Sequence, residues 1–452
     1  MRSFKSYAVA VLFLASCATD EEGKDNGILV TSEEQTNMRT PAEAMQIAQG
    51  AVSIFDDGPI QKSTGGNNHL PRTIDYADGV KCITASQAVP SCGDTLMYVV
   101  NYTDNQGFAV VSASRNTEEL LAVTENGHYN PDGTTIDNPG FRMFMEMAED
   151  YVSNAILRHP PHKDTTRTDT FGLGFKVFMW DTTYSQVNIE PKVKVQWYQV
   201  QPEGWYCSNG HCGCAITAAA QAMSYYRFPS SIKLNYSGAP NTVTNLFWEG
   251  ILAQHKHSNY QETITCSCNH EIHKQIGYLC RQLGKSSNSN YSNPLQTGTT
   301  INNIRTTLKN LGYTVSETQS YTNSAVLSNV NLDRILLVGG KTSTDAHMWL
   351  IDGCQQKTMI VKVYLVDPTY PVCDITTLRE TYSTLLKDLV HINWGWGGVD
   401  NGYYNNNVFN TAQCATKDQK QNSAGETYTG EVGHTSNHSF SELNYFTIYH
   451  TH

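Results

Sequence analysis

The sequence predicts a protein of the α+β class, because helical and strand-like patterns are segregated along the larger part of the chain. Apolar residues recur at helical spacing from Cys214 to Tyr226, and Pro229 ends that pattern. Four strand-like runs follow much later, at 335–338, 348–351, 359–366 and 389–392. A helical part followed by a sheet is typical of α+β architecture rather than of alternating βαβ units.

The first 160 residues or so carry a smaller α+β pattern of their own. Residues 40–43, Thr-Pro-Ala-Glu, have the composition of a capped helix start. Asn138 and Pro139 begin a second helix, which fades near Leu157. Three strand-like runs lie between the helices, at 97–102, 108–113 and 120–124. The first two flank a turn that contains glycine, so they predict a β-hairpin.

Length and charge limit the class of protein. A chain of 452 residues is too long for one ordinary domain. Its formal net charge is −11 and it has no sustained block of lysine and arginine, which argues against nucleic acid as a partner.

The N-terminus has the features of an export signal. Arg2 and Lys5 precede a short apolar run at 7–15, which is too short to span a bilayer. Residues 14–17, Leu-Ala-Ser-Cys, resemble a bacterial lipobox, in which Cys17 becomes the lipidated first residue of the mature protein. An ordinary signal peptide cut nearby is the alternative. We therefore expect an exported lipoprotein of the cell envelope, on the outer surface or the periplasmic face. It would be held to the membrane only through a lipid anchor. Activation could release the catalytic domain from that anchor.

Composition suggests how the chain divides into domains. A polar tether at 18–37 follows the signal. A stretch of proline, threonine and charged residues at 158–170 lacks the large apolar side chains that a folded core needs. These segments leave folded domains at 38–157 and 171–452, joined by a linker of the kind that proteases cut.

Apart from Cys17 and Cys214, ten cysteines remain, and they suggest disulfides because exported proteins mature in oxidising compartments. The alternative for some of them is a free buried thiol. Their connectivity does not follow from the sequence. Cys266, Cys268, His270 and His273 have a spacing that could hold zinc, but Cys-x-Cys is tight for such a site. We expect no metal and no cofactor.

Cys214 is the candidate nucleophile. It stands where a loop containing glycine gives way to the helical run. The positive end of a helix dipole stabilises a thiolate, which is the form of cysteine that attacks carbon. The alternative is a small buried cysteine that opens a core helix.

Three further positions fit a cysteine-based mechanism. His347 begins a strand-like run and follows Cys214 by 133 residues, within the range of about 130 to 150 known for papain-type enzymes. The alternative for His347 is a strand-edge histidine without a function. Asn393, or the backbone around Trp394, could orient the imidazole. Gln199 is the candidate amide donor for an oxyanion, and Gln196 and Gln201 stay open as rivals.

Together these residues resemble the streptopain family of cysteine peptidases. The resemblance rests on Trp197-x-Gln199, the run 213–223 around Cys214, His347 ahead of Ile-Asp-Gly, and Asn-Trp-Gly-Trp-Gly-Gly at 393–398. Residues 97–129 also look like that family's pro-domain.

The resemblance implies an inactive precursor with an inhibitory pro-domain at 38–157 and a papain-like catalytic domain at 171–452, made of a helical half and an antiparallel sheet half. It implies a catalytic dyad of Cys214 and His347, with Gln199 as oxyanion donor. The expected function is that of an exported cysteine endopeptidase that hydrolyses proteins through an acyl-enzyme. The alternative is a catalytically silent surface lipoprotein of the same fold, used for binding or adhesion.

Overall fold

The computed structural model describes most of the chain. The described residues are 38–56, 72–76, 80–84, 95–130, 138–158, 177–239, 243–253, 267–342, 345–366, 376–409, 419–421, 427–429 and 442–450. The predicted signal, Cys17 and the tether lie outside them, as does all of the predicted linker 158–170 except Arg158.

The chain forms two compact units, and each is described by itself. One unit comprises residues 1–37, 161–187 and 356–388; its described part consists of portions of β5 (Val177–Ile189), β11 (Ala346–Val366) and β12 (Thr376–Asn393). The other comprises residues 38–160, 188–355 and 389–452. This larger unit contains every candidate site residue that the structure describes.

The N-terminal α+β pattern is confirmed within the larger unit. Its elements are α1 (Pro41–Ala51), α2 (Ser53–Asp56), β1 (Val80–Thr84), β2 (Thr95–Asn101), the short helix η1 (Thr103–Asn105), β3 (Phe108–Ser112), β4 (Leu120–Thr124) and α3 (Pro139–Arg158). Thr40 and Glu43 form a reciprocal capping box that satisfies two backbone N–H groups at the start of α1. Strands β2 and β3 pair antiparallel, as the hairpin pattern predicted.

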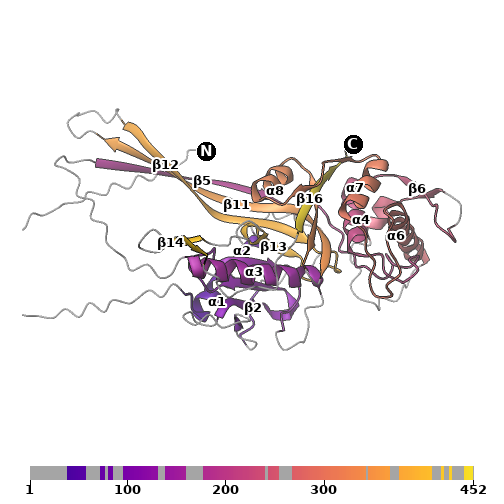
Figure 1. Cartoon of the computed structure of the whole chain (residues 1–452), viewed down its shortest axis with the longest axis horizontal. Coiled ribbons are helices and arrows are strands. Elements are labelled where there is room, and N and C mark those ends of the chain that lie inside the picture. Colours follow the sequence, from indigo (N-terminus) through magenta and orange to yellow (C-terminus); the bar gives the residue numbers. More distant parts are fainter. Residues whose placement is uncertain are drawn as a thin grey trace, which may run out of the picture. The chain divides into compact units, whose positions relative to one another are not determined.

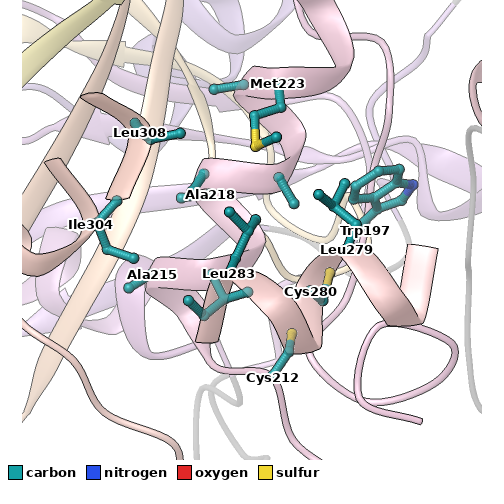
Figure 2. Close-up of a cluster of buried hydrophobic side chains, with 14 of the residues drawn as sticks. Trp197, Cys212, Ala215, Ala218, Met223, Leu279, Cys280, Leu283, Ile304 and Leu308 are labelled. Atoms are coloured by element: carbon teal, nitrogen blue, oxygen red, sulfur yellow. The ribbon is translucent and has the colours of Figure 1, made fainter. Parts of the chain in front are cut away.

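The helical half of the C-terminal part packs around α4 (Cys214–Tyr226). Its other helices are α5 (Trp248–Ala253), α6 (Ser267–Ser286), α7 (Ile301–Asn310) and α8 (Asn323–Asn331). Helices α4, α6 and α7 lie side by side (Figure 1). Figure 2 shows their shared core, where Met223 and Ala218 of α4 lie among Leu283, Ile304 and Leu308. Burial of these apolar side chains fixes the position of the helix that begins at Cys214.

The sheet half consists of strands far apart in the sequence. They are β8 (Thr314–Val315), β9 (Gln319–Ser320), β10 (Ile335–Lys341), β11, β12, β13 (Gly402–Asn405) and β16 (Glu442–Tyr449), followed after β13 by the short helix η2 (Asn406–Phe409). Two separate hairpins are β6 (Ser231–Lys233) with β7 (Val243–Asn245), and β14 (Gln419–Gln421) with β15 (Thr427–Thr429). Helices followed by an antiparallel sheet confirm the predicted fold class.

Two strand predictions were too short. The runs at 348–351 and 359–366 belong to one strand, β11, and the run at 389–392 is only the end of β12. The residues between the first two runs are mostly polar and gave no strand pattern in the sequence. Their backbone groups are nevertheless part of a hydrogen-bonded ladder, which does not depend on apolar side chains.

The strands of the N-terminal domain and those of the sheet half form one continuous sheet. Strand β4 pairs antiparallel with β13, so that Thr124 lies opposite Gly402 and Ala122 opposite Tyr404. The sheet order therefore runs from β1 through β4 to β13, β12, β11, β10, β16 and β8. The N-terminal domain is docked by adding its edge strand to the sheet of the C-terminal domain.

Two other findings concern cysteines and membranes. The six cysteines whose side chains are described, at positions 82, 207, 212, 214, 280 and 354, form no disulfide. Five of them, all except Cys214, belong to the ten for which disulfides were expected, so that expectation is wrong for these five and the alternative of unpaired thiols applies. Among the described helices, none combines the length and the apolar character needed to cross a bilayer.

Candidate active site

Cys214 is the first residue of α4, as predicted. The helix is capped by Gly213, whose carbonyl accepts from the N–H groups of Ile216 and Thr217. Only glycine suits this position, since its φ is +91° and a β-carbon would lie 2.5 Å from the carbonyl oxygen of Thr297. The glycine brings the chain close to a neighbouring loop and places the thiol at the N-terminus of the helix.

The thiol of Cys214 is neutral in this structure, contrary to what the helix N-terminus alone suggests. Burial raises the pKa of Cys214 above its ordinary value, although the N–H groups of Met348, Ala215 and Cys214 itself act in the opposite direction. The desolvation of the sulfur therefore outweighs the local dipoles. Met348 is the neighbour of His347, so the thiol lies at the strand that carries the candidate base.

His347 is held in β11 with only 4% of its surface exposed. Its Nε2 lies 2.9 Å from the carbonyl oxygen of Trp394. A carbonyl only accepts, so Nε2 carries the proton and donates it, which leaves Nδ1 as the basic nitrogen. Burial lowers the pKa of His347 to about 4, and the Trp394 carbonyl only partly offsets this. The imidazole is consequently neutral as well.

The rings of three tryptophans surround this imidazole. Trp349, Trp394 and Trp396 have ring centroids 6.3, 6.3 and 6.4 Å from that of His347. Within the described part of the chain, no hydrogen bond joins His347 to the sulfur of Cys214. Both groups are uncharged, and they are linked through the contact of the Cys214 sulfur with the N–H of Met348, next to His347.

Asn393 and Trp394 play different structural parts. The side chain of Asn393 faces α4 and the irregular segment before it, since its Oδ1 accepts from Gln221 Nε2 at 3.1 Å and its Nδ2 donates to the Val195 carbonyl at 3.0 Å. The group that contacts His347 is the backbone carbonyl of Trp394. Sequence reasoning named both residues, and the geometry separates them.

The three candidate glutamines also differ in their surroundings. The Nε2 of Gln199 is buried and has no hydrogen-bond partner among the described residues. Gln196 Nε2 contacts the carboxylate of Glu125 at 3.5 Å, and Gln201 is exposed. A buried unpaired amide costs stability, so its retention points to a group that arrives later and accepts the hydrogen bond.

Gln221 is a residue that sequence reasoning gave no role. It is fully buried on α4, two turns beyond Cys214. Its Oε1 accepts from the N–H of Trp197 at 2.9 Å, and its Nε2 donates to Asn393. One side chain therefore connects the nucleophile helix, the irregular segment that carries Trp197 and Gln199, and the Trp394 loop. A polar residue amid a run of alanines was the only signal of this in the sequence.

The N-terminal domain covers this site. A β-carbon at Gly140, in the first turn of α3, would lie 2.7 Å from His347 Cδ2 and would overlap the Trp394 ring. Arg142 makes an ion pair of 3.1 Å with Asp345, two residues before His347. Asn138 donates to Asp400 Oδ2 at 3.2 Å. The start of α3 thus lies directly against the imidazole and the loop that orients it.

Comparison with known proteins agrees with this arrangement. Residues 193–404 match the Peptidase C10 family, and residues 39–152 match the Spi protease inhibitor family. Streptopain from Streptococcus pyogenes serotype M28 is 21% identical over 345 residues, which cover 71% of this chain and 76% of that protein. Thiol protease/hemagglutinin PrtT of Porphyromonas gingivalis is 22% identical over 349 residues, 72% of this chain and 35% of that protein.

A solved structure is also similar. A fragment of Prevotella intermedia prointerpain A aligns with a TM-score of 0.48 and 18% identity, covering 82% of this chain and 98% of that one. The two family matches cover the site and the domain docked against it. The chain therefore belongs to the streptopain family, peptidase family C10, and is a cysteine endopeptidase made as a precursor with an inhibitory pro-domain.

Proposed function

We propose that this precursor becomes an exported endopeptidase in which Cys214 is the nucleophile, His347 the acid and base, and Gln199 the oxyanion donor. The observation that carries the proposal is the His347 Nε2 contact with the Trp394 carbonyl, which leaves Nδ1 as the nitrogen able to exchange a proton with the thiol. A thiol at a helix N-terminus and an unpaired buried amide at Gln199 support it.

The proposed reaction has two halves. The Cys214 thiolate attacks the peptide carbonyl, and the negative charge that develops on oxygen accepts from Gln199 Nε2 and the Cys214 N–H. His347, protonated on taking the thiol proton, gives that proton to the leaving amine as the C–N bond breaks. Water then adds to the thioester, His347 takes up its proton, and release of the carboxylic acid restores the thiol.

The start of α3 inhibits the peptidase in the precursor. Gly140 and Arg142 hold the His347 region while both catalytic groups are neutral. Departure of the pro-domain lets water and substrate reach the pair, and a thiolate and imidazolium can then form. We place the activating cleavage between residues 158 and 170.

The envelope location is a separate part of the proposal. Its support is the sequence of residues 1–17, with Cys17 as the lipidated residue. Metabolic labelling with a radioactive fatty acid in a bacterial host should mark the wild-type precursor and leave a Cys17→Ser variant unmarked. Equal labelling of both proteins would contradict the assignment.

The catalytic assignment is tested with the signal-less precursor. Intact mass is followed at neutral pH under mild reduction, for the wild type and for Cys214→Ala and His347→Ala variants. The wild type should lose about a third of its length and the variants should stay whole. A folded Cys214→Ala variant that still cleaves protein substrates would refute the nucleophile. The silent surface-lipoprotein alternative requires that the cut wild-type protein neither cleaves substrates nor reacts with a thiol-directed peptidase inhibitor.

A further inference from the structure

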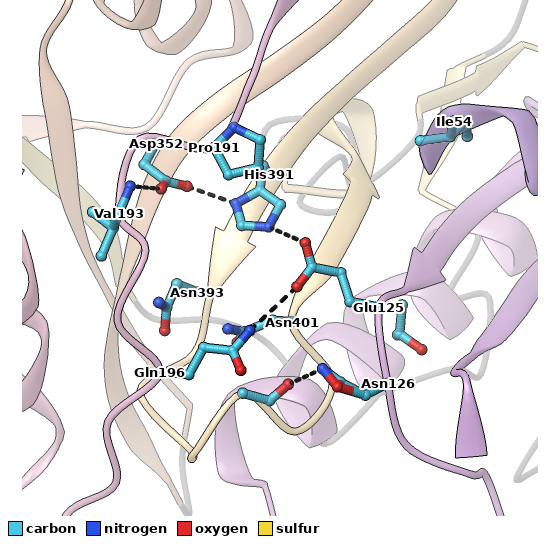
Figure 3. A network of polar contacts seen from close by, with 12 residues as sticks. Ile54, Glu125, Asn126, Pro191, Val193, Gln196, Asp352, His391, Asn393 and Asn401 are labelled. Carbon is cyan, nitrogen blue, oxygen red and sulfur yellow. Dashed lines mark hydrogen bonds and ion pairs between the residues drawn. The ribbon is translucent and has the colours of Figure 1, made fainter. Parts of the chain in front are cut away.

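A buried chain of charges crosses the junction between pro-domain and peptidase domain. The two nitrogens of His391, on β12, contact carboxylates on opposite sides, Asp352 Oδ1 at 2.6 Å and Glu125 Oε1 at 3.2 Å (Figure 3). His391 and Asp352 belong to the peptidase domain, whereas Glu125 directly follows β4 of the pro-domain. The side-chain exposures are 3% for His391, 0% for Asp352 and 26% for Glu125.

The peptidase side of this contact is built without help from the pro-domain. Asp352 Oδ2 accepts from the N–H of Val193 at 2.7 Å, so the carboxylate is fixed from both ends. The ring of His391 packs against Tyr403 with centroids 5.2 Å apart. Gln196 adds an amide 3.5 Å from the second oxygen of Glu125. We call Asp352, His391 and Gln196 the carboxylate site.

Backbone contacts on the pro-domain side fix the position of Glu125. Arg72 donates to the backbone carbonyls of Thr124 and Glu125 at 2.9 and 3.0 Å, which holds the end of β4 in place. The N–H of Glu125 donates to the Asn401 carbonyl at 2.7 Å, immediately before β13. A cavity of about 300 Å³ borders Glu125, so water can reach the remaining exposed part of its carboxylate.

The location of the site matters because strand pairing alone is not specific. Backbone hydrogen bonds between β4 and β13 would form in several alignments, and a shift of one residue turns every side chain to the opposite face. A charged group that finds its partner in one alignment only is a known means of fixing register. Glu125 stands at the end of the β4–β13 ladder, where it can select the alignment that brings Gly140 to His347.

We propose that the carboxylate site is a second recognition site of the peptidase domain, separate from the catalytic centre, and that its ligand is the Glu125 side chain of the chain's own pro-domain. Backbone pairing supplies much of the docking affinity, and Glu125 supplies its register and selectivity. The proposal rests on the inhibitory role of the pro-domain and does not depend on which residues carry out catalysis.

Charge supports this assignment. Burial alone lowers the pKa of His391, but the Asp352 and Glu125 carboxylates outweigh it and raise the pKa to about 10. In the docked state the His391 ring is therefore an imidazolium at neutral pH. For Glu125, burial raises the pKa, while the hydrogen bond and charge of His391, followed by Arg72 and Lys194, lower it overall. The carboxylate is bound in its charged form.

The test uses the full precursor with Cys214→Ala, which prevents self-processing, and with a recognition sequence for a site-specific protease inserted after Pro161. After the cut, the pro-domain is held only by its contacts, and its dissociation constant is measured by titration with a labelled pro-domain fragment released from the same protein. Glu125→Gln should raise that constant at least about a hundredfold, because it leaves His391 facing an uncharged partner. Glu119→Gln, an exposed carboxylate before β4, is the matched control and should change it less than about threefold.

Hydrogen exchange in the uncut chain separates docking from folding. Glu125→Gln should speed exchange at the β4–β13 amides and leave the β2–β3 amides protected. An unchanged dissociation constant for Glu125→Gln overturns the proposal. If the β2–β3 amides also exchange faster, Glu125→Gln has unfolded the pro-domain, and a variant of the peptidase side is needed. His391→Gln should then weaken docking of the wild-type pro-domain to a similar extent. An unchanged dissociation constant for His391→Gln would overturn the proposal. No readout requires catalysis, so a wrong assignment of Cys214 would instead appear as processing of the uncut Cys214→Ala chain.

Discussion

The α-carbon of Gly140 lies against the ring of His347, with room for a hydrogen but not for a methyl group. An added β-carbon would lie 2.7 Å from His347 Cδ2. Two residues 207 positions apart in the chain are thereby in direct contact. The closeness of this contact is possible only because position 140 has no side chain.

A methyl group at position 140 should loosen the inhibited state. Overpacking of this kind costs about 1–3 kcal/mol, so Gly140→Ala should weaken pro-domain docking about tenfold or more and shorten the half-time of precursor processing. Gly50→Ala is the matched control in the same domain, because nothing lies within 4 Å of a β-carbon there. Processing by Gly140→Ala at the rate of the wild type would contradict the role given to this contact.

The reactivity of Cys214 should change when the pro-domain leaves. Burial raises the pKa of Cys214 and lowers that of His347 to about 4, so both are neutral in the precursor at pH 7. Alkylation of the precursor thiol by iodoacetamide should therefore rise only above about pH 9, whereas the mature enzyme should react near neutral pH, about a hundredfold faster. Peptide mapping must identify the modified residue, since other thiols are free. Equal rates at pH 6 would refute the neutral pair.

The glutamine candidates can be separated by kinetics of the mature enzyme. Gln199→Ala should lower kcat by about 10²–10³-fold with little change in KM, because an oxyanion donor acts in the transition state. Gln196→Ala is the matched control; its amide contacts Glu125 of the pro-domain, which the mature enzyme lacks. A larger loss of kcat for Gln196→Ala than for Gln199→Ala would exchange their roles.

The sequence predicted those features of the fold that depend on capping residues, on helix-ending residues and on the spacing of apolar residues. The helix at Cys214 begins after a glycine and ends before Pro229, and the capped start of α1 follows from Thr40 and Glu43. Strand β11 was predicted in pieces, because residues 352–358 are mostly polar and only the ladder keeps them extended.

The catalytic residues of the site could be predicted from the sequence, but the residues that hold them in place and the contacts with the pro-domain could not. Cys214 and His347 could be named because a helix start and a strand start mark them. Glu125 and His391 contact each other across 266 positions, and no local pattern connects them. The raised pKa of Cys214 was likewise unforeseen, since the extent of burial depends on the assembled precursor.

Gln221 should prove essential to the architecture of the site. Gln221→Ala would leave the buried Trp197 N–H without this partner, at a cost of about 1–3 kcal/mol. The Asn393 amide oxygen would lose one of its two donors and keep the Gly395 N–H. The mature variant should unfold at lower denaturant and lose kcat. Gln282→Ala on α6, which disrupts contacts with Asn235, is the matched control: it should lower stability without lowering kcat in the folded enzyme. Full kcat in folded Gln221→Ala enzyme would show that Gln221 only stabilises the fold.

Docking of the pro-domain should weaken in acid, and Glu125 should be responsible. The titratable groups around it are His391, Asp352, Arg72, Lys194, Tyr403 and Tyr404. The pKa of Glu125 is lower in the docked state than its ordinary value of 4.5. A lowered carboxyl pKa means that the stabilisation is complete above about pH 5 and is lost as the pH falls through 4.5 toward the lowered value.

The cut complex carrying Cys214→Ala should therefore have its lowest dissociation constant between about pH 5 and pH 6.5, and the constant should also rise as the pH increases from 6.5, the ordinary pKa of His391, toward the docked value of about 10. Below that window the constant should rise steeply. Glu125→Gln should dock weakly at every pH, and its curve should meet that of the parent only in acid, where the parent carboxyl is protonated. Other carboxylates titrate in the same range, so the difference between the two curves is the quantity to measure. If the curves stay parallel down to pH 3.5, the acid sensitivity belongs to other groups, and Glu125 is not the residue whose charge secures the pro-domain.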